Sequence, residues 1–139
     1  MKKVMVFGTF DIFHKGHIHF LRQAKTFGDY LIVVVARDKT VKELKGNSVL
    51  HNEEYRKAQI EKSKLADKVI LGSLGDKYQV IRELTPDVIC LGYDQTFYVE
   101  ELSDKLVNLG LSGARIERLK SYMPEKYKSS KLRKIENKS

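Results

Sequence analysis

Residues 4–17, VMVFGTFDIFHKGH, decide how the rest of the chain folds. Their first four residues are an apolar run that predicts a buried strand, and Gly8-Thr9 ends it. From about Gly16 onward, apolar residues recur at helical spacing and predict a helix: Phe20, Leu21, Ala24 and Phe27. A turn from strand to helix presents backbone N–H groups and the positive end of the helix dipole, so this turn favours an anion.

Two histidines lie in this turn, three residues apart. His14 and His17 can both point at an anion there, and Gly16 lets a ligand approach the backbone closely. The chemistry that suits this arrangement is phosphate binding, with charge developing on a phosphorus centre. The alternatives are a metal site and two histidines placed in a loop by chance.

The ten residues GTFDIFHKGH, Gly8–His17, resemble the signature of the nucleotidyltransferase superfamily with a His-x-Gly-His motif. Its members include cytidylyltransferases, pantetheine-phosphate and nicotinamide-mononucleotide adenylyltransferases, and FAD synthases. The resemblance implies that both histidines contact the triphosphate and stabilise the transition state. It also implies that the nucleotide is bound by the residues around them: Thr9, Phe10, Lys15 and Gly16.

Length and composition are typical of one domain covering residues 1–139. The chain is 42% hydrophobic and has no apolar run near the ~20 residues of a membrane span, so we expect a cytoplasmic protein without a signal peptide or membrane contact. The single cysteine, Cys90, lies in an apolar run and reads as core. The net charge of +8 is concentrated in a basic tail, about 120–139. Such charge suits nucleic acid, a membrane surface or an anionic substrate, and without a basic aromatic face we expect no nucleic-acid partner.

Predicted strands and helices alternate along the chain. We expect strands at 4–7, 31–36, 67–72, 88–91 and 113–119, with helices beginning near residues 16, 52, 76 and 99. Gly28 should end the first helix, Asn52 should cap the second, and residues 37–50 should form a polar loop. The expected fold is a single α/β, Rossmann-like domain with a doubly wound parallel sheet of about five strands, in the order 3-2-1-4-5.

In such a sheet, ligands bind where the strand order reverses, which places His14–His17 beside residues 92–95. Asp94 can there accept a hydrogen bond from a ribose or base amine. Asp11 should lie near the reacting phosphates and serve substrate or metal, or fix the loop. We assign no resident metal site. Neither a P-loop nor a dinucleotide fingerprint is present, which argues against kinases and dehydrogenases.

Several residues have a functional and an ordinary interpretation. Lys42 and Lys45 occupy a loop in which relatives carry phosphate-binding lysines, and the alternative is two surface lysines. Arg56 resembles a substrate-holding arginine of cytidylyltransferases, and the alternative is a solvent-facing helix residue. Ser129 resembles the start of a triphosphate-binding motif, and the alternative is a simple helix cap. Tyr55 is expected on the apolar side of the helix that follows Asn52.

Two branches of the superfamily match the length of the chain. One is glycerol-3-phosphate cytidylyltransferase, whose C-terminal motif is interrupted here by an insertion. The other is the archaeal-type FAD synthase, which the chain resembles over most of its length, including Leu91–Thr96 and Lys120–Tyr122. That branch would make Asp94 and Tyr122 ATP-site residues, with Tyr122 stacking on adenine.

The interpretation that we carry forward is transfer of AMP from ATP to FMN, giving FAD and pyrophosphate. A divalent cation, Mg²⁺, would accompany ATP, and the resemblance favours a homodimer. The alternatives are a cytidylyltransferase acting on glycerol 3-phosphate or another small phosphate, and a non-catalytic nucleotide- or RNA-binding module. The intact His-x-Gly-His motif argues against the module.

Overall fold

Five parallel strands form one sheet at the centre of the computed structural model, which describes residues 1–45, 50–76, 78–92 and 99–119. The strand order is β3-β2-β1-β4-β5, as predicted. The strands are β1 (Lys3–Gly8), β2 (Tyr30–Val35), β3 (Lys68–Leu71), β4 (Val88–Leu91) and β5 (Arg115–Arg118). The helices are α1 (Lys15–Lys25), α2 (Asp38–Lys45), α3 (Glu53–Ser63), α4 (Gln79–Leu84) and α5 (Val99–Asn108).

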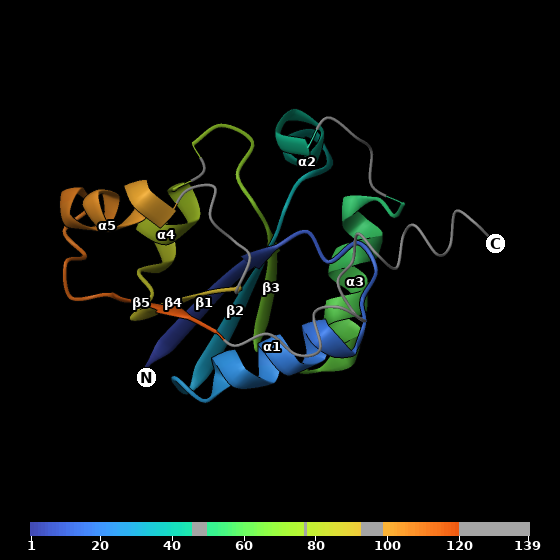
Figure 1. Ribbon diagram of the computed structural model, residues 1–139, viewed down its shortest axis with the longest axis horizontal. Helices are drawn as coiled ribbons and strands as arrows, with labels where there is room; N and C mark the ends of the chain where they lie inside the picture. The colour runs from blue at the N-terminus through green and yellow to red at the C-terminus, as the bar shows by residue number, and fades with distance from the viewer. Residues whose placement is uncertain (46–49, 77, 93–98, 120–139) are drawn as a thin grey trace.

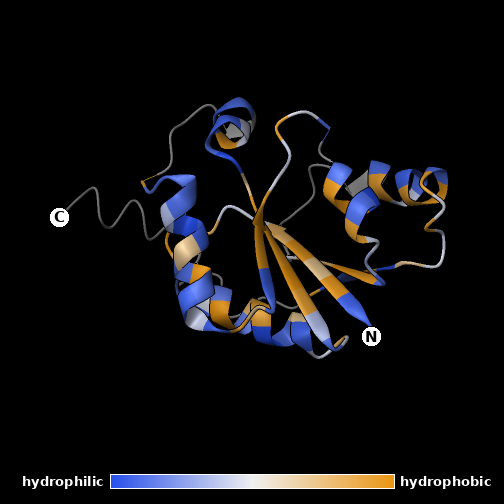
Figure 2. Cartoon of the chain, turned by 180° about the vertical axis from the view of Figure 1, so that it is seen from behind, coloured by the Kyte–Doolittle hydropathy of each residue, from blue (hydrophilic) through white to orange (hydrophobic). Residues whose placement is uncertain are grey.

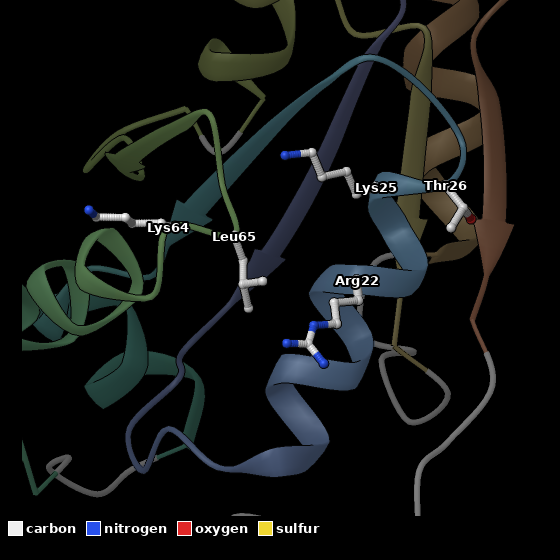
Figure 3. Close-up of a pocket in the computed structure, with 5 residues that line it drawn as sticks. All are labelled: Arg22, Lys25, Thr26, Lys64 and Leu65. Atoms are coloured by element: carbon white, nitrogen blue, oxygen red, sulfur yellow. The ribbon is translucent and has the colours of Figure 1, made fainter.

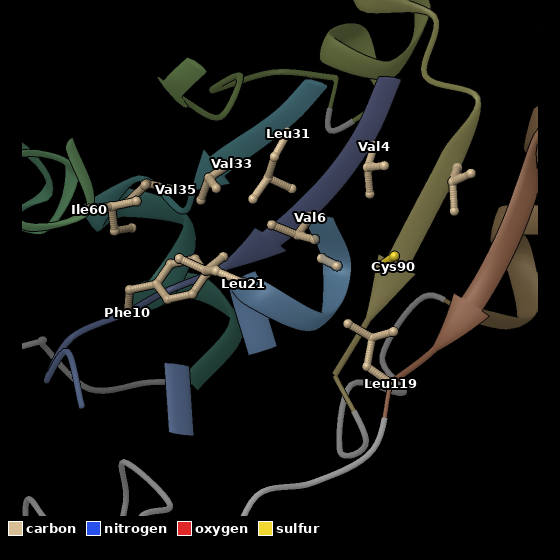
Figure 4. Packing of buried hydrophobic residues seen from close by; sticks show 12 residues of the cluster. Val4, Val6, Phe10, Leu21, Leu31, Val33, Val35, Ile60, Cys90 and Leu119 are labelled. Atoms are coloured by element: carbon tan, nitrogen blue, oxygen red, sulfur yellow. The ribbon is translucent and has the colours of Figure 1, made fainter. Parts of the chain in front are cut away.

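Helices cover both faces of the sheet, with α1 and α3 on one side and α4 and α5 on the other (Figure 1). The side chains of successive residues of β1 point to opposite faces of the sheet, as in any pleated strand. Val4 and Val6 pack with Leu21 of α1 and Ile60 of α3, in the cluster drawn in Figure 4. Met5 joins the second cluster, formed with α4 and α5. The strands are therefore apolar on both faces, as their orange colour in Figure 2 shows.

Helix α2 corrects the predicted polar loop at 37–50. Among the residues of this segment whose burial the structure describes, Val41 is the buried apolar one, and the sequence lacks the repeat that marks a helix. The helix begins at Asp38, whose backbone N–H donates to Oε1 of Glu53 at 2.9 Å. This capping group comes from α3, fifteen residues further along the chain, and local sequence does not reveal it.

Gly28 does not end the first helix, because α1 stops at Lys25 and its cap is Thr26. The role of Gly28 is close packing. A Cβ atom at this position would lie 2.6 Å from the backbone oxygen of Lys2 and 2.7 Å from Cγ2 of Val4. The glycine is thus required where the chain passes next to the start of β1.

Other predictions are confirmed. Asn52 caps α3 by accepting from the Tyr55 N–H at 2.8 Å, and Cys90 is fully buried in β4. Burial raises the pKa of the Cys90 thiol to about 12, as expected of a core residue. No helix in the described ranges is long and apolar enough to span a bilayer. The basic tail lies outside the described residues.

Candidate functional site

The turn that follows β1 is shaped by Phe10, which has a positive φ of 54°. Non-glycine residues adopt this conformation rarely, and such strain is concentrated at functional sites. The Phe10 ring is buried and folds back over Gly8, where a Cβ atom would lie 2.6 Å from the ring. Its edge also meets the His17 ring, with 5.2 Å between the ring centres. Phe10 therefore sets the direction in which the chain leaves the sheet.

His14 and His17 cap the N-terminus of α1 reciprocally. The Nδ1 atom of His14 accepts from the Gly16 N–H at 3.0 Å, and the His14 side chain also accepts from the backbone of His17. In return, Nδ1 of His17 accepts from the His14 N–H at 3.4 Å. The two rings stack, with 3.9 Å between their centres, so the motif brings both imidazoles together as expected.

Both imidazoles are electrically neutral near pH 7. The pKa of His17 is lowered to about 3, chiefly by burial and also by the neighbouring His14, whereas a backbone hydrogen bond with Ile12 acts in the opposite direction. Burial also lowers the pKa of His14. Because each Nδ1 accepts a hydrogen bond, the proton of each neutral ring lies on Nε2.

Asp11 ties the motif to the segment before α3. Its two carboxylate oxygens accept from the backbone N–H groups of Leu50 and His51, both at 2.9 Å. The residue is only 5% exposed. These contacts favour the second interpretation of Asp11, in which it fixes the loop.

Arg56 is fully buried, so its interpretation as a solvent-facing helix residue is wrong. The guanidinium donates from Nη1 to the carbonyls of Thr9 and Ala36, at 2.9 and 2.8 Å. Its Nε donates to the His51 carbonyl at 3.0 Å, and Nη2 pairs with Asp38 at 2.6 Å. These four contacts join the motif turn, the end of β2, the start of α2 and the start of α3.

Tyr55 is 47% exposed and corrects the prediction that it lies on the apolar side of α3, which buries Arg56 and Ile60 instead. Its ring stacks on that of His51, with 4.4 Å between the ring centres. The sequence analysis missed this pair, although a spacing of four residues at a helix start indicates it.

Other predicted site residues are less constrained. Lys15 and Lys42 are exposed, and Lys45 is the last residue of α2. Gly92 follows β4, and its carbonyl accepts from Nη1 of Arg118 at 2.9 Å, a contact not foreseen from the sequence. Three further predicted site residues lie outside the described residues: Asp94, Tyr122 and Ser129.

A hollow of about 260 Å³ lies beside the C-terminal half of α1, away from the His14–His17 turn (Figure 3). Five residues line it: Arg22, Lys25, Thr26, Lys64 and Leu65. Two of its cations belong to the last turn of α1, where positive charge complements the helix dipole. None of these five lining residues belongs to the His14–His17 motif, so the hollow is not part of the candidate phosphate site.

This chain is similar to known proteins over most of its length. The cytidylyltransferase-like family model matches residues 5–135. An FAD synthase from Picrophilus torridus is 41% identical over 132 residues, 95% of this chain and 94% of its own, and one from Thermoplasma volcanium is 43% identical over 96% and 93%. The solved structure of a lipopolysaccharide core biosynthesis protein from Thermoplasma volcanium superposes with a TM-score of 0.82 at 44% identity, covering 88% of this chain and 98% of that one.

Proposed function

The chain belongs to the cytidylyltransferase-like family, and we propose that it transfers AMP from ATP to FMN, giving FAD and pyrophosphate. The observation that carries the proposal is the match to FAD synthases at more than 40% identity over nearly the full length of both chains. The reciprocal pairing of His14 and His17 at the start of α1 is consistent with it.

In this reaction a phosphate oxygen of FMN attacks the α-phosphorus of ATP. One P–O bond forms, the bond between the α-phosphorus and the bridging oxygen breaks, and pyrophosphate leaves with that bond's electron pair. The attacking phosphate is already ionised at pH 7, so no general base is required. The protein has to align the two substrates and neutralise the charge that moves to the leaving group.

His14 and His17 are the catalytic residues of this proposal. Each neutral ring carries its proton on Nε2, and in His17 this N–H would have to leave its backbone hydrogen bond with Ile12 to stabilise a phosphate oxygen as the charge on that oxygen increases. Lys15 is exposed beside them and adds positive charge at the same helix end, where the dipole also favours an anion. The backbone of Thr9 and Phe10 lines the nucleotide side of the turn.

Mg²⁺ is proposed to enter with the triphosphate. The described residues contain no group of three acidic, histidine or cysteine side chains that could hold a metal. Magnesium keeps several waters and takes many of its ligands from substrate phosphates. When bound, the ion neutralises part of the phosphate charge.

A cytoplasmic homodimer is also part of the proposal. A cytoplasmic location follows from the use of ATP and FMN and agrees with the single reduced cysteine. The dimer rests on the resemblance of the whole chain to its relatives.

The first experiment crosses two nucleotides with two acceptors and measures pyrophosphate release with Mg²⁺. ATP and CTP are each combined with FMN and with glycerol 3-phosphate, and FAD formation is followed by chromatography. Of these four pairs, we expect only ATP with FMN to give turnover. Turnover with CTP would overturn the substrate assignment, and no turnover with any pair would favour a binding module.

The same assay tests the two histidines. His14→Ala and His17→Ala should each lower kcat by about 100-fold or more, as for loss of one transition-state donor. His19→Ala is the matched control, because it removes a third imidazole of the same helix that lies outside the motif. Full activity in both motif variants would refute the mechanism.

A further inference from the structure

We propose that the stacked rings of His51 and Tyr55 form the subsite for the isoalloxazine ring of FMN. This inference rests on the proposed function, because it takes the acceptor to be a flavin. A flavin presents a broad, flat and largely apolar ring system, which binds well against an aromatic face. Leu50, His51 and Tyr55 are together called the α3 platform.

The α3 platform combines an aromatic pair with an exposed aliphatic side chain. Tyr55 is 47% exposed and Leu50 is 43% exposed. The rings of Tyr55 and His51 lie 30° from parallel, with 4.4 Å between their centres. Tyr55 belongs to neither hydrophobic cluster of the described residues, so packing in the core does not account for its ring.

The platform is attached to the catalytic turn. The N–H groups of Leu50 and His51 are held by the carboxylate of Asp11. Asp11 precedes His14 by three residues, so their Cα atoms lie within about 11 Å of each other. Arg56, the neighbour of Tyr55, holds the Thr9 carbonyl in the same turn. These bonds join the platform to the same turn that carries the two histidines, where the phosphate of FMN would bind.

The position of the α3 platform relative to the sheet also favours binding of the acceptor over binding of the nucleotide. Nucleotides in such sheets bind where the strand order reverses, between β1 and β4. Helix α3 lies on the other side of β1, against β2 and β3. In-line displacement requires the attacking oxygen and the leaving pyrophosphate on opposite sides of the α-phosphorus. An acceptor that approaches from the α3 side leaves the β4 side to the nucleotide.

Other apolar side chains in the described ranges fit less well. Leu74 and Val107 are exposed, but neither is aromatic, and Val107 belongs to α5 on the opposite face of the sheet. Phe10 is buried, and Phe13 packs against the core and against His17. Among the exposed large apolar residues of the described ranges, Tyr55 is the aromatic one, and it belongs to the α3 platform.

The test measures KM for FMN, KM for ATP and kcat in Tyr55→Ala and Tyr55→Phe. Alanine favours helix, so the fold should persist. We expect KM for FMN to rise about tenfold in Tyr55→Ala, the loss of one aromatic stacking contact. KM for ATP and kcat should stay within twofold, and Tyr55→Phe, which retains the ring, should restore KM for FMN. Val107→Ala is the exposed control that should change none of these.

A second measurement does not depend on turnover. Binding of FMN alone, followed by quenching of flavin fluorescence, should weaken about tenfold in Tyr55→Ala and stay unchanged in Tyr55→Phe. Unchanged KM and binding in Tyr55→Ala, with an active wild type, would overturn the subsite and leave the proposed function intact. Equal rises in KM for ATP and FMN would also overturn it. A wild type that makes no FAD would overturn the proposed function and the flavin subsite together.

Discussion

The buried guanidinium of Arg56 yields the sharpest prediction of the structure. The Arg56→Met variant keeps a long unbranched chain in the same space and removes every donor. Three backbone carbonyls then lose a partner, namely those of Thr9, Ala36 and His51. Asp38 also loses its cation, but its side chain is 44% exposed and can be solvated by water.

The magnitude follows from those four contacts. Each carbonyl left without its donor costs about 1 kcal/mol, at the low end of the range for buried groups. The partly exposed ion pair adds roughly 0–1 kcal/mol. Arg56→Met should thus lower the free energy of unfolding by about 3–4 kcal/mol, and Tm by about 10 °C for a domain of this size. Arg56→Lys should recover only part, because one ammonium group cannot reach acceptors on four segments.

The assays are urea unfolding and thermal unfolding, both followed by circular dichroism, with Lys57→Met as the matched control. Lys57 is the next residue of α3, and its ion pair with Glu61 is exposed, so its loss should cost under about 0.5 kcal/mol. A fall in Tm of less than 2 °C in Arg56→Met would refute this account. If activity were lost at unchanged stability, Arg56 would be a substrate contact, as its resemblance to cytidylyltransferases implies.

Three further perturbations test other parts of the same framework. In Asp11→Asn one of the two N–H groups loses its oxygen, so stability should fall by about 1–2 kcal/mol and amide exchange at residues 50 and 51 should speed up. Because the pKa of His17 is about 3 when folded and 6.5 when unfolded, protons favour the unfolded state as pH falls below 6.5. Wild type should lose about 2 kcal/mol from this residue between pH 7 and pH 5, and pH-dependent urea unfolding of His17→Asn should lack that loss. Gly28→Ala, with its Cβ against the Lys2 carbonyl, should cost about 1–3 kcal/mol in the same unfolding assay, whereas Gly75→Ala, with open space around it, should not.

The strands could be predicted from the sequence because their signal is local. Apolar runs such as Leu31–Val35 and Val88–Leu91 are typical of strands buried on both faces, and the alternation of strands with helices restricts the order of a parallel sheet to few possibilities. The motif was also predictable, since ten consecutive residues carry it. Its context, at the end of the first strand, agreed with the structure.

What the sequence did not reveal depends on contacts between distant segments. Helix α2 starts where Glu53 supplies the acceptor for its first N–H, and Gly28 is needed because Lys2 passes beside it. Arg56 stands among charged neighbours on a helix, a pattern typical of a solvated face, yet four carbonyl and carboxylate oxygens converge on it. In each case at least one of the contacting residues lies fifteen or more positions away in the sequence.

The His14–His17 motif satisfies the N-terminus of α1 with its own side chains. The N–H groups at the start of α1 would be costly to leave unpaired, and the His14 side chain takes the place of an anion there. Burial keeps both imidazoles neutral, so the two rings can stack without repulsion. A triphosphate bound at this turn would bring negative charge beside both rings, which acts to raise the pKa values that burial lowers. The same two residues therefore stabilise the turn and can respond to the charge of a nucleotide bound beside them.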